Sequence, residues 1–362
     1  MRDVRISLAT TVLILVCIGF VMIYSASGIY ALQELKDSTY FLKRHLLFFF
    51  IGLILSFLVM SIDYRHLQLY AKPLLIFSFI LLVLVLIPGI GKESYGARRW
   101  FKVGMFNFQP SELARMAMIV YVADYLSRKQ ILIRNFRQGL LPILMIMGAM
   151  CLLIVKQPDL GSTVSIAVIV MAMIFVAGAR LLHMGFLVFS AIPILVYLIV
   201  KEPYRIARIM AFLDPWQDSQ GIGFQLTQSQ IALGSGGLFG LGSGQSQQKL
   251  FYLPAAHTDF ILSIIGEEFG LVGTLLIVGL FIFFLWQGIK IAHRSLDSFG
   301  YFLSVGILTM IGFQATVNIG VSIGALPTKG LPLPFISYGG SALIFNMMAV
   351  ALLLNISRIQ DL

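Results

Sequence analysis

The chain has 362 residues, of which 59% are hydrophobic and only 12% are charged. Its apolar residues fall in long runs, which excludes a soluble globular enzyme and indicates a polytopic membrane protein. The formal net charge of +10 is better explained by membrane topology and an anionic ligand than by nucleic acid, which is not an expected partner.

Long apolar runs recur along the whole chain. A membrane core of about 30 Å needs about 20 mostly apolar helical residues, and roughly ten runs approach that length. The runs are continuous and lack the alternation of barrel strands, so helices are expected. We predict one all-α integral membrane domain over residues 1–362, with a retained first span and no internal linker. The predicted spans are residues 8–26, 46–60, 67–87, 110–125, 139–155, 161–178, 181–200, 271–291, 301–325 and 341–356.

The distribution of basic residues predicts the orientation. With ten spans both termini lie on one side of the membrane, and the short loops on that side are basic. Longer loops on the other side contain about as many Lys and Arg, but at a lower density. Because short loops dominate orientation, we predict that both termini are cytoplasmic. The basic residues of the short loops are Arg128, Lys129, Arg134, Arg137, Lys290 and Arg294.

Two outer loops are expected to carry the function. One covers residues 88–109, and the other, residues 201–258, is far longer than a connection requires. Within the longer loop we predict a short amphipathic helix at residues 206–213 and a second helix at 224–233. A glycine-rich stretch follows at residues 234–244. It lacks the Gly-Lys-Ser/Thr ending of a nucleotide-binding P-loop, so we expect a flexible turn.

One carboxylate, Asp259, stands where the longer loop runs back into apolar sequence. It begins a helical run that reaches Ile291, and at 1.5 Å per residue this run would be about 50 Å long, more than a bilayer. We therefore expect the run to project outward, lie obliquely or kink at Gly266 or Gly270, with Asp259 near the outer membrane face. A helix cap, supplied by Asp259 or by Thr258, is the simpler alternative.

Other ionisable residues lie within or beside the predicted spans. Glu112 and Arg115 are three positions apart on one helical face and can pair. Ion pairing alone would explain them, but charges inside spans also face cavities, so a substrate-site role stays open. Asp159, at the outer end of the fifth span, is open to the same two interpretations, helix cap or site. Glu267 and Glu268 point to other sides of the helix from Asp259 and are not expected to form a tight carboxylate pair.

Cations also lie near aromatic residues in both outer loops. Arg99 belongs to the sequence Arg-Arg-Trp-Phe-Lys at residues 98–102, which is typical of an interfacial anchor. Arg205 and Arg208 give the longer loop a similar capacity. Guanidinium groups bind phosphate through two parallel hydrogen bonds, so these arginines are also candidates for a lipid-pyrophosphate site. His257, beside Asp259, is the histidine that we single out for a functional test.

Several segments in the same order carry a family resemblance. Together they resemble the SEDS family of shape, elongation, division and sporulation proteins over most of the chain. Residues 202–205 and 326–330 look more like the FtsW division branch than the RodA elongation branch. The segments are Gln-Pro-Ser-Glu at 109–112, Gln-Pro-Asp-Leu-Gly at 157–161, Gln-Leu-Thr-Gln-Ser at 225–229, His-Thr-Asp-Phe at 257–260, Gly-Glu-Glu at 266–268 and the proline- and glycine-rich stretch 325–341.

The resemblance implies a ten-helix peptidoglycan glycosyltransferase of the bacterial inner membrane, acting at the division septum. Such an enzyme polymerises lipid II, extends a glycan linked to undecaprenyl pyrophosphate, and has an essential carboxylate at the position of Asp259. A lipid pyrophosphate leaves as a stable anion, so no acid is needed. We expect Asp259 to act as general base on the 4-hydroxyl of the incoming sugar, with inversion at the donor anomeric carbon.

The resemblance also implies partners and further site residues. The partners are a class B penicillin-binding protein transpeptidase of the FtsI type and divisome proteins of the FtsQ, FtsL and FtsB type. A bound divalent cation, Mg²⁺ or Mn²⁺, is compatible with a pyrophosphate substrate, although no motif specifies one. Arg115 replaces the lysine common in the family, which preserves charge but not shape. The expected substrate-binding residues are Arg99, Glu112, Arg115, Asp159, Arg205, Arg208, His257, Lys329 and Ser337.

Three other functions stay open on the sequence. A transporter that flips the lipid-linked precursor would also use intramembrane charges and broken outer segments. A polymerase of the RodA elongation type would share the chemistry but act in a different process. A catalytically silent scaffold for a partner synthase is the third.

Overall fold

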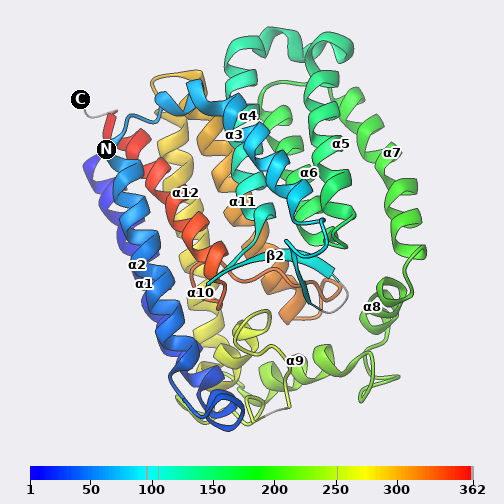
Figure 1. Ribbon diagram of the computed structural model, residues 1–362. Coiled ribbons are helices and arrows are strands. Elements are labelled where there is room, and N and C mark those ends of the chain that lie inside the picture. Colours follow the sequence, from blue (N-terminus) through cyan, green and yellow to red (C-terminus); the bar gives the residue numbers. More distant parts are fainter. Residues whose placement is uncertain (95–96, 105, 251, 360–362) are drawn as a thin grey trace.

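The computed structural model describes residues 1–362 except 95–96, 105, 251 and 360–362. Helices dominate, and most stand side by side in one bundle (Figure 1). The helices are α1 (Arg2–Leu35), α2 (Tyr40–Ser61), α3 (His66–Leu84), α4 (Pro110–Lys129), η1 (Gln130–Arg134), η2 (Phe136–Leu140), α5 (Leu141–Val155), α6 (Leu160–Val176), α7 (Leu181–Val200), α8 (Pro203–Leu213), α9 (Phe224–Ser235), α10 (Ile261–His293), α11 (Ser298–Ser322) and α12 (Gly340–Ile359).

Each of the ten predicted spans coincides with a helix, but the helices are not equally apolar. In the described part of the chain, eight are long and apolar enough to cross a membrane: α1, α2, α3, the joined η2 and α5, α7, α10, α11 and α12. Helix α6 is apolar but has only 17 residues. Helix α4 is the most polar of the ten and is almost wholly buried, packed against α3, α6 and α11. Protein neighbours instead of lipid allow it to carry charged side chains.

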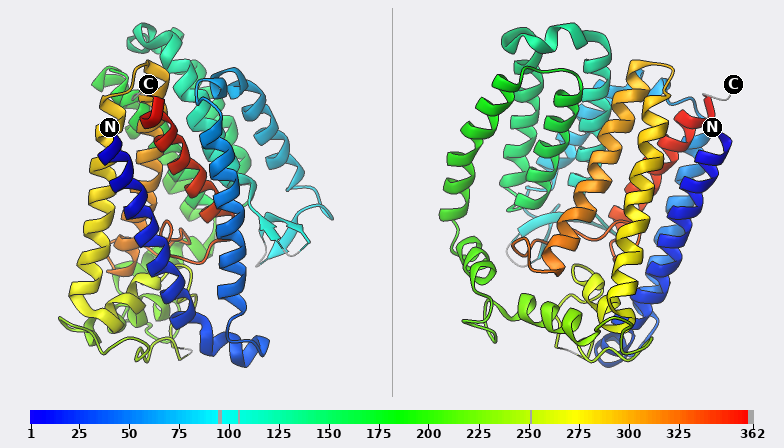
Figure 2. Two further views of the ribbon diagram at one scale, coloured as in Figure 1. Left: turned by 90° about the vertical axis from the view of Figure 1, so that its left-hand side faces the viewer. Right: turned by 180° about the vertical axis from the view of Figure 1, so that it is seen from behind.

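The two ends of the bundle differ. The start of α1, the end of α12 and the turn formed by η1 and η2 lie at one end, and α8 and α9 lie at the other (Figures 1 and 2). This arrangement agrees with the prediction that the termini share a side. The end with the termini is called the inner end below, following the predicted orientation.

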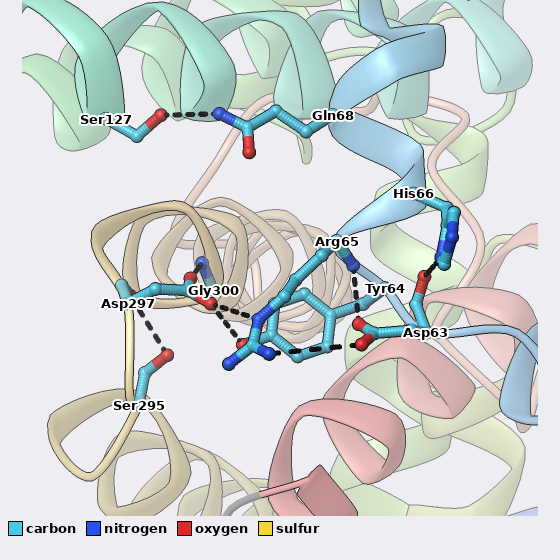
Figure 3. Close-up of polar contacts among 9 residues, drawn as sticks. All are labelled: Asp63, Tyr64, Arg65, His66, Gln68, Ser127, Ser295, Asp297 and Gly300. Atoms are coloured by element: carbon cyan, nitrogen blue, oxygen red, sulfur yellow. Dashed lines mark hydrogen bonds and ion pairs between the residues drawn. The ribbon is translucent and has the colours of Figure 1, made fainter.

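A polar cluster joins two turns at the inner end. The hydroxyl of Tyr64 and Nε of Arg65, in the turn between α2 and α3, donate to one carboxylate oxygen of Asp297 at 2.6 and 3.0 Å (Figure 3). The other oxygen of Asp297 accepts from Gly300 N at 2.6 Å and caps α11. One carboxylate therefore ties the α10–α11 turn to the α2–α3 turn.

The all-α prediction missed a small sheet in the first outer loop. Strands β1 (Lys92–Ser94), β2 (Ala97–Val103) and β3 (Phe106–Phe108) pair antiparallel in the order β1-β2-β3. Trp100 lies opposite Lys92, and Phe101 lies opposite Phe108. The aromatic residues of this loop favour a pleated strand, whereas the sequence pattern had indicated an interfacial anchor beside candidate pyrophosphate-binding arginines.

The longer outer loop follows the sequence prediction closely. Helix α8 covers the predicted residues 206–213 and begins earlier, at Pro203, because proline suits the first turn of a helix. Helix α9 covers the predicted second helix. The glycine-rich stretch is an ordered series of turns: the N–H groups of Leu241 and Gly242 donate to the carbonyls of Glu267 and Glu268 at 2.9 and 3.0 Å. The predicted turn is therefore confirmed, and these hydrogen bonds attach it to α10.

Helix α10 is kinked at Gly270, one of the two predicted positions. Its backbone dihedrals there are φ 66° and ψ −160°, which favour glycine. A Cβ at this residue would lie 2.5 Å from Gly240 N and from the Leu238 carbonyl. The kink thus allows the glycine-rich turns to approach the helix closely.

Two buried carboxylates hold the segment of α10 before the kink. Glu267 accepts from the hydroxyl of Ser246 and from Gln247 N at 2.9 Å. Glu268 pairs with Lys249 Nζ at 2.9 Å and accepts from the hydroxyl of Ser25, on α1, at 2.6 Å. As predicted, neither forms a pair with Asp259. They anchor the helix that follows Asp259 to α1 and to the outer loop.

Candidate active site

Four of the predicted site residues line one cavity of about 410 Å³. They are Arg99, Glu112, Asp159 and Asp259, which come from the sheet, the start of α4, the turn before α6 and the loop before α10. The cavity walls also include α2 and the loop that leads into α12. The other lining residues are Arg44, Phe48, Lys92, Trp100, Asn107, Gln109, Ser162, Thr258, Gly330, Leu331, Pro332, Tyr338, Gly339, Gly340, Ser341 and Ala342.

The backbone of Asp259 is firmly held while its carboxylate faces the cavity. Its N–H donates to the Ala255 carbonyl at 3.1 Å, and its carbonyl accepts from Asn318 Nδ2 at 2.8 Å. Asn318, on α11, also donates to the Leu331 carbonyl at 2.9 Å, so one amide joins the two loops. No hydrogen bond from another described residue reaches the carboxylate. The N-cap of α10 is Phe260, so the helix-cap interpretation of Asp259 is wrong.

The surroundings of Asp259 make it a stronger base than an ordinary aspartate. Burial raises the pKa of its carboxyl to about 6, and the positive charge of Arg208 opposes this rise. A Cβ on Gly330 would lie 3.2 Å from Asp259 Oδ2, so glycine lets the loop before α12 lie close to the carboxylate. Asp259 is therefore ionised at neutral pH and poised to accept a proton.

Two cations that sequence reasoning missed, Arg44 and Lys92, line the same cavity. The guanidinium of Arg44 lies 4.6 Å from the ring centre of Tyr40, and its Nε is buried without a hydrogen-bond partner among the described residues. Arg44 lies two residues before the predicted span at residues 46–60 and was not among the predicted site residues. The signal was the sequence Lys-Arg-His at 43–45, which places three groups that can carry charge at the start of a span.

Arg99 lines the cavity and also joins two of the segments that form its wall. Its Nε donates to the Gln157 carbonyl at 2.8 Å, and one Nη donates to the Pro158 carbonyl at 2.6 Å. The guanidinium thereby ties the sheet to the turn between α5 and α6. These two hydrogen bonds hold Asp159 at the cavity wall.

The carboxylates of α4 and α6 are paired or capped. Arg115 Nη1 lies 3.2 Å from Glu112 Oε2, and both side chains are at most 7% exposed, which confirms the predicted pair. Asp159 caps α6 by accepting from Ser162 N at 3.0 Å, and it accepts from Gln109 Nε2 at 3.2 Å. The cap interpretation of Asp159 is therefore correct, and the residue lines the cavity as well.

Lys329 and Ser337 lie in the loop between α11 and α12, outside the described lining of the cavity. Burial lowers the pKa of Lys329 to about 8, while Asp159 opposes this shift and Arg115 adds to it. Lys329 thus lies within electrostatic reach of the α4 and α6 charges. The hydroxyl of Ser337 accepts from Leu333 N at 2.9 Å and stabilises the loop.

Two further predicted site residues, Arg205 and His257, lie outside the described lining of the cavity. Arg205 is buried and donates to the Leu198 carbonyl at 2.5 Å and the Tyr204 hydroxyl at 2.9 Å, which fixes α8 on α7. The ring of His257 packs 4.5 Å from Phe41 and 5.8 Å from Tyr338, centre to centre. Burial lowers the pKa of His257 to about 4, so it is a neutral packing residue at neutral pH.

The described lining combines carboxylates with cations that can receive an anion. Asp259 supplies a basic oxygen, while Arg44 and Lys92 supply positive charge that the protein itself has not fully neutralised. The carboxylate can remove a proton from an attacking hydroxyl, and the cations can stabilise a phosphate leaving group. The described residues include no group of three or more His, Cys, Asp or Glu that could bind a metal ion by themselves.

Comparisons with known proteins converge on one family. The family model described as cell cycle protein, which covers FtsW, RodA and SpoVE, matches residues 5–361. The chain is 49% identical to stage V sporulation protein E of Bacillus subtilis (96% of this chain, 94% of that protein) and 47% identical to a probable peptidoglycan glycosyltransferase FtsW of Trichlorobacter lovleyi (96% and 91%).

Two solved structures share the fold. A chain from a peptidoglycan synthase complex in which polymerization and crosslinking are coordinated superposes with a TM-score of 0.78 at 31% identity. The rod shape determining protein RodA of Thermus thermophilus superposes with a TM-score of 0.73 at 29% identity. Both comparisons cover 98% of this chain and 97% of the other.

Proposed function

The chain belongs to the family of cell cycle proteins that includes FtsW, RodA and SpoVE, and from this premise we propose that it is a peptidoglycan glycosyltransferase that polymerises lipid II into glycan strands. Relatives named as peptidoglycan glycosyltransferases are 45–47% identical to it over 95–96% of its length. The observation that carries the proposal is the Asp259 carboxylate, which faces a cation-lined cavity without a hydrogen bond from any other described residue.

Asp259 acts as the general base in this proposal. Its carboxylate accepts the proton of the acceptor 4-hydroxyl while that oxygen bonds to the donor anomeric carbon. The bond from this carbon to the lipid pyrophosphate breaks, and the pyrophosphate leaves with the electron pair. Arg44 and Lys92 stabilise the negative charge that develops on the leaving group. Attack opposite to the leaving group inverts the donor anomeric carbon.

The other predicted residues take supporting roles in the same proposal. Arg99 and Asp159 shape the wall, and the buried Glu112–Arg115 pair lies beneath it. Lys329 adds positive charge from the loop before α12, and the positive charge of Arg208 favours the ionised form of Asp259. His257, Arg205 and Ser337 position the loops that enclose the substrate.

A divalent cation, Mg²⁺ or Mn²⁺, fits the site only as an ion shared with the substrate. Mg²⁺ in phosphate-processing enzymes is often held by one or two carboxylates together with phosphate oxygens. Asp159 or Asp259 could supply the protein ligand, and the metal would add positive charge for the leaving group. Exhaustive chelation of the purified protein should then slow polymerisation; an unchanged rate would remove the metal from the proposal.

The process and the partners are also proposed from the relatives. FtsW relatives favour septal cell-wall synthesis in a bacterial inner membrane, with an FtsI-type class B penicillin-binding protein and proteins of the FtsQ, FtsL and FtsB type as partners. The 49% identity to stage V sporulation protein E makes spore formation a second candidate process with the same chemistry. Depletion of the protein during growth and during sporulation distinguishes the two.

The function is tested by sizing the products made from lipid II. Purified protein with its class B partner should form glycan chains, and these chains should persist when the partner's transpeptidase nucleophile is removed. Transfer of lipid II across liposomes without chain formation would support a flippase instead. Chains that form only when a separate glycosyltransferase is added to the protein and its class B partner would indicate a scaffold.

A further inference from the structure

A second cavity, of about 460 Å³, lies at the inner end, away from α8 and α9. Three arginines, Arg134, Arg137 and Arg180, and one histidine, His183, line it. The described lining contains no carboxylate. This inner cationic pocket takes no part in the chemistry proposed above, so its charge needs a separate explanation.

The pocket is built by two turns that are far apart in sequence. One consists of η1 and η2, which join α4 to α5, and the other joins α6 to α7. The ring of Phe136 contacts that of His183 edge-on, with 5.5 Å between centres, and links the two turns. A Cβ on Gly139 would lie 2.0 Å from the Leu132 carbonyl oxygen, so glycine allows η1 and η2 to pack tightly. The pocket is therefore formed before any ligand arrives.

The cations of the pocket are not neutralised by the protein. No ion pair joins any of its three arginines to an acidic residue in the described part of the chain. Arg128, just before them, behaves differently: its Nε lies 2.6 Å from the Asp124 carboxylate. Nδ1 of His183 is buried and has no hydrogen-bond partner among the described residues. Like charges gathered at one pocket repel one another unless an anion joins them.

The surroundings of the pocket are apolar. Ile131 is 92% exposed, and Leu181 and Leu182 are 72% and 81% exposed. Leu181 and Leu182 begin α7, one of the helices that can cross a membrane, so they lie where acyl chains begin. A ligand with an anionic head and apolar tails would pair with the arginines of the pocket and cover the exposed apolar residues beside it.

We propose that the inner cationic pocket binds the headgroup phosphate of an anionic phospholipid, with its acyl chains along the start of α7. Guanidinium groups bind phosphate oxygens in pairs, and basic pockets between membrane helices on the cytoplasmic side are suited to such headgroups. The bound lipid bridges the α4–α5 and α6–α7 turns. Two helices that reach the active-site cavity at their other ends, α4 and α6, are thereby joined at the inner end.

Topology alone would also place arginines in inner loops, because basic loops stay in the cytoplasm. That effect depends on charge and is indifferent to guanidinium geometry. Replacing the three arginines by lysine therefore separates the two explanations. Orientation should be unchanged in the lysine variant, while lipid binding should weaken, since lysine lacks the planar fork.

The test measures lipid bound to the full-length protein by native mass spectrometry, with phosphatidylglycerol as the probe and phosphatidylcholine as the neutral comparison. The triple variant Arg134→Gln/Arg137→Gln/Arg180→Gln should bind phosphatidylglycerol at least on the order of 100-fold more weakly, because each lost charge-assisted hydrogen bond to the phosphate weakens binding by about ten-fold. The matched control Arg2→Gln/Lys290→Gln/Arg358→Gln removes three other positive charges and should bind like the unmodified protein.

Equal weakening in the control variant, or equal binding of phosphatidylcholine, would overturn the proposal. Competition by millimolar inorganic phosphate as effective as the lipid itself would show a soluble-anion site instead. If the triple variant fails to insert, a photoactivatable phosphatidylglycerol on the unmodified protein decides the question. Adducts are expected within residues 131–137 and 180–183, and adducts confined to other segments would contradict the assignment.

Discussion

Asp259→Asn is expected to reduce the rate of lipid II polymerisation by about 10²- to 10⁴-fold, the range that general bases contribute. Asparagine has nearly the shape of aspartate but does not accept the proton. The two hydrogen bonds of the residue 259 backbone, to Ala255 and from Asn318, do not involve the side chain. The fold and the binding of lipid II should therefore persist. Initial rates of glycan formation, together with thermal unfolding, measure both.

Asp214→Asn is the matched control for this variant. Asp214 is an exposed carboxylate of the same outer loop, directly after α8, so its replacement changes the net charge equally. It should leave the rate unchanged. A rate for Asp259→Asn within a factor of about three of the control would remove the general base from the account, because even a weak base contributes about 10²-fold.

Arg44→Gln is expected to lower kcat by about 10²-fold. Removal of one donor that stabilises developing negative charge costs about 10²- to 10³-fold in enzymes where this has been measured. Arg44 lines the cavity and forms no ion pair with an acidic residue in the described part of the chain, so its positive charge is available to the leaving pyrophosphate. Arg44→Lys should recover part of the rate, since it restores charge without the planar donor pair.

The neighbouring cation Lys43 provides the control for Arg44. Lys43 forms an exposed ion pair with Asp37 at 2.9 Å, away from the cavity, and such surface pairs contribute little. Lys43→Gln should therefore polymerise lipid II like the unmodified protein. If both glutamine variants slow polymerisation equally, Arg44 acts through the general charge of the loop and does not contact the leaving group.

Sequence patterns predicted the helices because bilayer thickness fixes the length of an apolar span. They also placed Asp259 just before α10 and offered a kink at Gly266 or Gly270 as one of three ways to fit a run longer than the bilayer, of which the structure shows the kink at Gly270. The small sheet was missed because Trp100 and Phe101 suit an interface and a strand equally well. A window of local hydropathy does not distinguish these two environments.

The composition of the cavity was harder to predict than the helices. Arg44 and Lys92 reach it from α2 and β1, and no local pattern shows that these elements meet Asp259. Arg99 was predicted from its chemistry, but its hydrogen bonds to carbonyls at residues 157 and 158 depend on a contact across more than fifty residues. His257 lies beside Asp259 in sequence, and its packing on aromatic rings could not be distinguished from a catalytic role.

The central claim is that Asp259 is the base that activates the acceptor hydroxyl, and the pH dependence of polymerisation tests it most directly. Because burial raises the pKa of Asp259 to about 6, kcat/KM should fall about ten-fold per pH unit below pH 6, as the carboxylate becomes protonated. Lys329, whose pKa is lowered to about 8, should add a decline above pH 8 that Lys329→Arg moves to higher pH. A rate that stays constant from pH 7 down to pH 5 in the unmodified enzyme would contradict the account.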